Sequence, residues 1–288
     1  MNSLVENQIN KFLSGRGIIE RKILSKAFNI KCEKVILDTN QTLIFKYYIK
    51  KNQEFNSIIS ETKSLNFFSK KFPHLFPSII FSSNNLLIMD YIINNNIKKN
   101  DYQELLLKEI IKIHSISNKK FGFDFDSQIG GLRQPNKFNT NWVVFYRDNR
   151  LNMIFEILNK TNPMPNTINK KLEKLIKNLH NFIPHNPKIS LLHGDLWDGN
   201  ILFNDGKLVG LIDPGGYFGH NELEIAYLTW FKFIDQKFIN EYSNIINLDS
   251  SYYEYEAIYQ LYFSLLNVHL WSRDYIKDVE DLLYSIKL

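Results

Sequence analysis

The segment His193–Asn200, which reads His-Gly-Asp-Leu-Trp-Asp-Gly-Asn, constrains the possible folds of this chain more than any other. The apolar pair Leu191-Leu192 leads into it, and apolar runs at 200–203 and 208–212 follow it. This order predicts a short strand, a polar turn and then a β-hairpin. A further carboxylate, Asp213, leaves the hairpin directly before a proline. Polar side chains that can bind ligands therefore stand at the beginning and at the end of one small hairpin.

Three of these side chains fit the transfer of a phosphoryl group from ATP. The reaction needs a positioned acceptor hydroxyl, metal ions that bridge the phosphates, and cations near the developing charge. Asp195 can accept the proton of the hydroxyl, and Asn200 and Asp213 can offer oxygen atoms to Mg²⁺. Protein kinases have the same spacing between base and asparagine, with a later metal-binding aspartate. A polar turn that only caps a strand is the alternative, but the agreement between the turn and its flanking strands favours the catalytic interpretation.

The N-terminal part of the chain alternates β-like runs with one helical pattern. The predicted elements are strands at 34–37, 42–49, 79–81 and 86–93, and a helix at 54–71. The turn composition of 38–41 joins the first two strands into a hairpin. Apolar residues close to helical spacing predict the helix, and the prolines after it end it.

Lys46 lies in the second strand of this hairpin, and Glu61 lies in the helix. A lysine and a glutamate so placed can meet across a small sheet, with the lysine directed at the α- and β-phosphates. Lys50 and Lys51 are competing lysines, and Glu54 is the other glutamate of the predicted helix. The downstream motif favours Lys46 and Glu61 as the pair that binds the nucleotide.

The apolar strand at 86–93 leads into a polar connector at 94–100. Kinases commonly hold adenine through backbone groups at such a connector. We therefore expect Asp90, Tyr91 and Ile92 to contact the nucleotide base. The alternative is a core strand, an interpretation that suits most of these side chains in either case.

The C-terminal part of the chain reads as mainly helical. The predicted helices lie at 102–115, 142–159, 168–182, 222–233, 237–246, 253–272 and 277–286, and a long polar loop lies at 121–141. The order predicts an α+β fold with two lobes. Together with the motif at His193–Asn200, this arrangement resembles the protein-kinase-like fold. We expect an ATP-binding lobe at 1–93, with a small antiparallel sheet and one helix. The rest, 94–288, is expected to be a larger, mainly helical lobe for catalysis and substrate binding.

Composition narrows the alternatives. The chain has 288 residues, of which 44% are hydrophobic, so it can bury a core and is not disordered. The formal net charge of +5 comes from scattered lysines, which argues against a nucleic-acid partner. Cys32 is the single cysteine, so an intramolecular disulfide and a four-cysteine metal site are excluded. We expect no signal peptide, no membrane partner and a cytoplasmic location.

The motifs resemble those of the fructosamine (ketosamine) kinase family. The segments that carry the resemblance are 129–136, 142–151, 193–200, 212–222 and 262–271. His193–Asn200 resembles the family's His-Gly-Asp-Leu-Trp-x-Gly-Asn, in which the tryptophan separates the family from many aminoglycoside and choline kinases. The resemblance covers the chain from about Leu43 to Tyr275 and is specific in the second lobe.

The resemblance implies ATP and Mg²⁺ as cofactors and a small-molecule or protein-bound ketosamine as substrate. A sugar hydroxyl would be phosphorylated, the adduct would become unstable, and the amine would be recovered. Trp197 and Trp142 are candidates to stack on the sugar or its amine-bearing part, and Asp198 is a candidate partner for a cationic amine. Tryptophans lie in cores more often than in binding sites. We expect a monomer or a weak homodimer.

The chain departs from the family pattern in the first hairpin. The family has a glycine pair over the phosphates, where this chain reads Leu24-Ser25-Lys26-Ala27-Phe28-Asn29. Glycine there permits close approach of the backbone to phosphate, and Lys26 is a candidate compensating cation. Two alternatives remain open: a kinase of the same fold for an aminoglycoside, choline or homoserine, and a catalytically silent nucleotide-binding protein.

Overall fold

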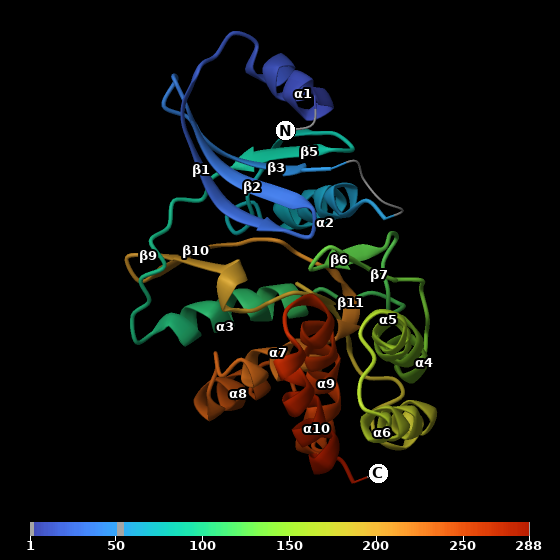
Figure 1. Cartoon of the computed structure of the whole chain (residues 1–288). Helices are drawn as coiled ribbons and strands as arrows, with labels where there is room; N and C mark the ends of the chain where they lie inside the picture. Colours follow the sequence, from blue (N-terminus) through green and yellow to red (C-terminus); the bar gives the residue numbers. More distant parts are fainter. Residues whose placement is uncertain (1–2, 51–54, 288) are drawn as a thin grey trace. The chain divides into compact units, whose positions relative to one another are not determined.

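The structure is a computed structural model that describes residues 3–50 and 55–287. The chain divides into two compact units. The first unit contains Met1–Tyr102, Ser127–Arg133 and Gly199–Gly215, and the second contains Gln103–Asp126, Gln134–Asp198 and Gly216–Leu288. The second unit thus begins near the predicted connector, but two later segments belong to the first unit. Figure 1 labels the helices and strands of both units.

The first unit is built on an antiparallel sheet of five strands in the order β1-β2-β3-β5-β4. The strands are β1 (Ile18–Ala27), β2 (Ile30–Leu37), β3 (Thr42–Tyr48), β4 (Ile79–Ser82) and β5 (Leu86–Asp90). The predicted hairpin is β2–β3, in which Val35 pairs with Leu43 and Cys32 with Lys46. Strand β1 has no clear pattern in the sequence, because all but its two end residues are exposed.

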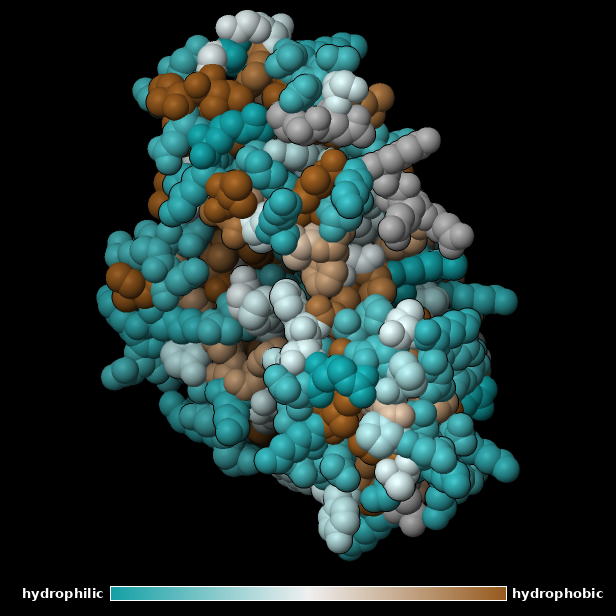
Figure 2. Space-filling model, viewed as in Figure 1, coloured by the Kyte–Doolittle hydropathy of each residue, from teal (hydrophilic) through white to brown (hydrophobic). Residues whose placement is uncertain are grey.

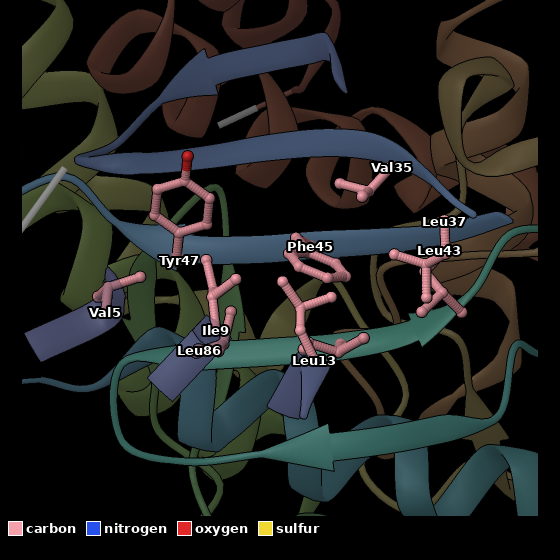
Figure 3. Close-up of a cluster of buried hydrophobic side chains, with 10 residues drawn as sticks. Val5, Ile9, Leu13, Val35, Leu37, Leu43, Phe45, Tyr47 and Leu86 are labelled. Carbon is pink, nitrogen blue, oxygen red and sulfur yellow. The ribbon is translucent and has the colours of Figure 1, made fainter. Parts of the chain in front are cut away.

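Helix α1 (Ser3–Leu13) covers one face of this sheet and was not predicted. Its buried residues Val5, Ile9 and Leu13 recur every four positions and therefore share one face of the helix. They pack against a common cluster with Val35, Leu37, Leu43, Phe45, Tyr47, Leu86 and Ile88 (Figure 3). Full burial of each such side chain stabilises the fold by about 1.5–3 kcal/mol. The apolar spacing of α1 was the sequence signal for this helix.

Helix α2 (Ser57–Lys71) contacts strands β4 and β5. Its N-cap is Asn56, whose side chain accepts a hydrogen bond from the backbone N–H of Ile59 at 3.0 Å. The helix was predicted to begin at Glu54, which lies outside the described residues. Side chains alternate between the faces of a strand, so Lys46 lies on the face opposite Phe45 and the α1 cluster.

Two further hairpins complete the β-structure of the first unit. The hairpin of β9 (Ile201–Asn204) and β10 (Lys207–Leu211) confirms the predicted one and turns at Asp205-Gly206. It is tied to the connector, because the backbone N–H groups of Asn95 and Asn96 donate to the carbonyl of Phe203 at 3.1 and 2.8 Å. The predicted polar loop contains a short pair of strands, β6 (Ser127–Ile129) and β7 (Leu132–Gln134), and α2 contacts β6.

The second unit is mainly helical, as predicted. Its helices are α3 (Tyr102–His114), α4 (Trp142–Tyr146), a π-helical turn (Arg147–Leu151), α5 (Asn152–Thr161), α6 (Asn166–Lys177), α7 (Asn221–Trp230), α8 (Gln236–Ser243), α9 (Tyr252–Leu270) and α10 (Ile276–Ser285). Short 3-10 turns lie at Leu179–Asn181, Asp198–Asn200 and Arg273–Tyr275. Helix α9 contacts α5, α7 and α10 and is central to this unit.

A short antiparallel pair of strands lies at the start of the catalytic motif. Strand β8 (Ile189–Leu192) pairs with β11 (Tyr217–His220), which was not predicted. The register pairs His220 with Ile189, so α7 begins beside the start of β8, and α7 contacts β8. Within residues 3–50 and 55–287, no helix is long and apolar enough to cross a membrane.

Candidate active site

Lys46 forms ion pairs with two carboxylates in the first unit. Its ammonium nitrogen Nζ lies 2.7 Å from Oε1 of Glu61 on α2, and it also donates to Oδ1 of Asp213, which follows β10. Lys46 is 9% exposed and Glu61 is 4% exposed, so the ammonium group has little contact with water. The structure therefore brings together three residues that the sequence predicted to act on the nucleotide and its metal.

Electrostatics favour a charged lysine in this group. Burial lowers the pKa of Lys46, but Asp213 and Glu61 outweigh burial and raise that pKa above its ordinary value. Burial raises the pKa of Glu61 to about 7, while Lys46 opposes the shift and the negative charge of Asp213 adds to it. The physical reason is that two carboxylates share one ammonium group, so the more deeply buried carboxylate is the easier one to protonate.

Asp213 has a backbone conformation that is uncommon for a residue with a side chain. Its φ angle is 56°, in the left-handed region, and the residue that follows is a proline. A side chain with a Cβ atom is strained there, and a residue before proline avoids the helical regions. Such strain is found at functional sites that the surrounding structure holds in place. Here the ion pair with Lys46 is part of that support.

Asn200 and Asp213 flank the open end of the β9–β10 hairpin. Ile201 pairs with Leu211, and the backbone N–H of Ile212 donates to the carbonyl of Asn200 at 3.1 Å. An amide oxygen and a carboxylate are hard ligands of the kind that Mg²⁺ prefers, and the ion keeps water molecules as its remaining ligands. The residues present therefore fit a magnesium site.

Asp195 follows β8 in the second unit, and its turn is held by a carboxylate that sequence reasoning missed. Glu224 on α7 accepts hydrogen bonds from the backbone N–H groups of His193 at 3.1 Å and Gly194 at 2.7 Å. Gly194 has a φ of 84°, which a residue with a side chain rarely adopts. These two hydrogen bonds fix the backbone that leads directly into Asp195. The only sequence signal for Glu224 was a glutamate between Leu223 and Ile225 in an apolar helix.

Glu224 is a buried anion. It is 3% exposed, and Nε2 of His114 lies 3.0 Å from its Oε2 atom. Nδ1 of His114 lies 2.8 Å from the hydroxyl of Tyr242, so both ring nitrogens have partners. Burial acts to raise the pKa of Glu224, but His114 and the Gly194 N–H outweigh burial and lower it below the ordinary value. Glu224 therefore stays ionised and holds the turn with charge-assisted hydrogen bonds.

The three predicted substrate contacts have different environments. Trp197 is half-buried, with its ring centroid 6.0 Å from that of Phe231, and Asp198 is exposed. Trp142 is 0% exposed, and its indole N–H donates to the hydroxyl of Tyr259 at 2.8 Å. Burial favours a packing role for Trp142, whereas Trp197 and Asp198 have surface available for a ligand.

The predicted adenine contacts lie at the end of β5. The backbone N–H of Asp90 donates to the carbonyl of Ser78 at 3.0 Å, and the ammonium of Lys34 lies 4.2 Å from the centroid of the Tyr91 ring. The side chain of Ile92 lies directly over Gly210 of β10, where an added Cβ atom would come within 2.4 Å of it. An alanine at that position would have to displace the end of the Ile92 side chain.

The first hairpin is closed by two residues that are not glycine. Ala27 pairs with Ile30, and the intervening Phe28 and Asn29 have φ angles of 50° and 64°. Two consecutive residues with positive φ define a type I′ turn, which asparagine tolerates and phenylalanine does not favour. The candidate cation Lys26 is exposed on this hairpin.

Cys32 pairs directly with Lys46 across β2 and β3 and is 7% exposed. Burial raises the pKa of its thiol to about 12. The side chain is therefore a neutral thiol near neutral pH and not a reactive thiolate.

Similarity to solved structures confirms the predicted protein-kinase-like fold class, and the small antiparallel sheet with its buried Lys-Glu pair agrees with it. The structure of the ADP-bound aminoglycoside phosphotransferase APH(2'')-Ib is similar to this chain with a TM-score of 0.64 and 18% identity, over 99% of this chain and 98% of the other. A solved structure from Thermobifida fusca, assigned as a fructosamine-3-kinase, has a TM-score of 0.84 and 20% identity, over 98% and 97%.

Sequence comparison identifies the family within this class. The model of the fructosamine kinase family matches residues 10–287, so the chain belongs to that family and is a phosphotransferase. A probable ketoamine kinase of Vibrio cholerae is 27% identical over 251 residues, which cover 84% of this chain and 85% of the relative. The protein-ribulosamine 3-kinase of Arabidopsis thaliana is 28% identical over 209 residues, or 70% and 63% of the two chains. The family resemblance and the predicted enzyme class are thus confirmed.

Proposed function

We propose that this chain transfers the γ-phosphoryl group of ATP to a sugar hydroxyl of a ketosamine. The observation that carries the proposal is the ion pairing of Lys46 with both Glu61 and Asp213, in a chain of the fructosamine kinase family. A silent relative would have no need of a buried lysine, a strained aspartate and a supported catalytic turn together.

The residues have separate roles in the reaction. Asp195 accepts the proton of the acceptor hydroxyl as the oxygen bonds to the γ-phosphorus. The bond from phosphorus to the bridging oxygen breaks, and its electron pair stays on the β-phosphate of ADP. Lys46, oriented by Glu61, faces the phosphates of ATP and offsets their charge.

Asn200 and Asp213 would hold Mg²⁺. When bound, the ion supplies positive charge to the phosphate oxygens. Backbone groups of Asp90–Ile92 are proposed to hold adenine.

The acceptor is inferred from the relatives and from the side chains near the catalytic turn. Relatives of this chain are named ketoamine kinase and protein-ribulosamine 3-kinase. The half-buried ring of Trp197 offers an apolar face for a sugar, and the exposed carboxylate of Asp198 suits a protonated amine. Phosphorylation would destabilise the adduct and release the amine, which makes deglycation the proposed outcome. The oligomeric state and the cytoplasmic location stay predictions.

A substrate panel tests the proposal. The purified chain is incubated with ATP, Mg²⁺ and one acceptor at a time: a fructosamine, a ribulosamine, an aminoglycoside or choline. We expect release of ADP with the two ketosamines, followed by release of the free amine. Turnover with the aminoglycoside or choline but with neither ketosamine would contradict the assignment of the acceptor.

A further inference from the structure

A phenol lies beside the proposed catalytic base. The hydroxyl of Tyr227, on α7, lies 3.3 Å from Oδ1 of Asp195 and donates a hydrogen bond to it. Tyr227 stands one helical turn after Glu224, so one helix reaches the catalytic turn twice. Glu224 binds the backbone of the turn, and Tyr227 binds its functional side chain.

The ring of Tyr227 is tightly fixed. It stacks on Phe263 of α9 with centroids 3.7 Å apart and planes 13° apart, and it meets Phe231 edge to face at 5.0 Å. Tyr227 is 6% exposed. An aromatic ring with neighbours on its face and edge cannot turn its hydroxyl away without loss of packing. The donor therefore reaches Asp195 from a fixed direction.

The hydroxyl can act only as a donor toward Asp195. Burial raises the pKa of Tyr227 well above its ordinary value, and the negative charge of Asp195 adds to this shift. The phenol thus keeps its proton throughout the pH range in which a kinase works. A protonated donor beside a carboxylate stabilises its charged form.

We propose that Tyr227 is a positioning residue for the catalytic base: its hydroxyl binds Oδ1 of Asp195, fixes the rotation of the carboxylate and stabilises its charge. The inference rests on the proposed function, in which Asp195 is the base. It adds a residue outside His193–Asn200 that acts on the chemical step and not on the binding of either substrate.

The test is Tyr227→Phe, which removes the hydroxyl and keeps the stacked ring. A matched control is Tyr252→Phe on α9. Tyr252 is 0% exposed and its hydroxyl donates to another carboxylate, Oε1 of Glu256, at 3.0 Å. Both substitutions remove a buried phenol that donates to a half-buried carboxylate, but only one of these bonds reaches Asp195.

We expect Tyr227→Phe to lower kcat about tenfold with KM for both substrates nearly unchanged, since a hydrogen bond to a charged group is lost in the chemical step. The acidic limb of the pH–kcat profile should move to higher pH. The other titratable groups that interact with Tyr227 or Asp195 are Glu224 of α7, Tyr262 of α9 and His193 of the turn, and both variants retain them. Tyr252→Phe should lower the melting temperature similarly and leave kcat and the pH profile unchanged.

Equal kcat values and pH profiles in the two variants would overturn the inference. The comparison is made with whichever acceptor of the panel the wild type phosphorylates, so a wrong acceptor does not affect it. A wild type that turns over no acceptor at all would overturn the proposed function and this inference together.

Discussion

The catalytic turn and the first hairpin differ in what holds them in place. The turn that carries Asp195 is held by hydrogen bonds from its backbone to Glu224, a buried and ionised carboxylate. The β1–β2 hairpin lies at the edge of its sheet, and its first strand is exposed along almost its whole length. Hydrophobic residues reach the visible surface where Figure 1 draws β1 (Figure 2), and Ile19, Ile23 and Leu24 of this strand are exposed.

The tip of the β1–β2 hairpin is held by contacts with the residues that follow β3. The backbone N–H of Ile49 donates to the carbonyl of Asn29 at 2.9 Å. The backbone N–H of Lys50 donates to the side-chain oxygen of Asn29 at 3.0 Å. The difference is consistent with the tasks that the proposed function and the family resemblance assign to the turn and the hairpin. A side chain that takes a proton must be fixed closely, whereas a hairpin that covers phosphates acts mainly through its backbone.

Removal of the base should have the largest effect on the turn. Asp195→Asn keeps the size of the side chain and removes its ability to accept a proton. We expect kcat to fall by about 10²–10⁴ with the melting temperature retained. The measurement is steady-state release of ADP beside a thermal melt. Near-normal turnover in this variant would remove Asp195 as the base.

Loss of the Glu224 carboxylate, which holds the turn, should have the second-largest effect on kcat. Glu224→Gln replaces the ion with a neutral amide that also carries a donor, so one of the N–H groups of His193 and Gly194 or the His114 contact loses its acceptor. We expect kcat to fall at least tenfold and the free energy of unfolding to fall by about 1–3 kcal/mol.

Glu222→Gln is the matched control for this variant. Glu222 lies on the same helix and is 1% exposed, but it accepts from the Asp249 N–H at 2.5 Å and from Tyr255 and not from the turn. It should cost similar stability with a much smaller loss of kcat. Equal losses of kcat in both variants would mean that Glu224 supports the fold generally.

Sequence reasoning found the residues with local signals and missed those whose partners are distant. Asp195 and Lys46 could be placed from motif spacing and strand pattern. Glu224 could not, because its contact with Gly194 spans 30 positions and depends on the unpredicted strand β11. Helix α1 has a periodic signal at Val5, Ile9 and Leu13, so it could have been predicted from the sequence.

Strand β1 had no such signal, since alternation arises only when one face of a strand is buried. The ion pair between Lys46 and Asp213 was not predicted either. The sharing of Lys46 by two carboxylates depends on residues 167 positions apart, and no local pattern records it.

The cluster of Lys46, Glu61 and Asp213 should make KM for ATP depend on pH, with an effect of intermediate size. As pH rises through about 7, Glu61 loses its proton and pairs more strongly with Lys46. We expect KM for ATP to be lower at pH 8 than at pH 6 in the wild type, and to vary less in Glu61→Gln. Steady-state titrations of ATP at both pH values measure this. The same change in the wild type and in Glu61→Gln would assign the titration to another group.

Stability should move in the opposite direction. The pKa of Glu61 in the folded chain, about 7, lies above its ordinary value of 4.5. The folded state therefore prefers the protonated form, and this contribution to stability is complete below pH 4.5 and is lost as pH rises through 7. Thermal melts should show that Glu61→Gln loses less stability than the wild type between pH 5 and pH 8.

The hairpin tip should give the smallest effect, and one that shows whether the tip has any fixed partner. An added Cβ atom on Gly131, in the β6–β7 turn, would lie 2.8 Å from Cβ of Phe28, so the two turns are in contact. Gly131→Ala introduces this clash together with backbone strain, because Gly131 has a φ of 79°.

A double-mutant cycle separates the clash from the strain, because only the clash depends on Phe28. Phe28→Gly removes the Cβ atom of this residue, so the double variant Phe28→Gly/Gly131→Ala should be more stable than the sum of the single variants predicts, by about 0.5–1 kcal/mol. Ile23, which is 55% exposed on the same hairpin, gives the control cycle Ile23→Gly/Gly131→Ala, and its effects should add. Urea unfolding of all variants measures the coupling. Additivity in both cycles would show that the tip is held only by the end of β3, and the contrast with the catalytic turn would then be complete.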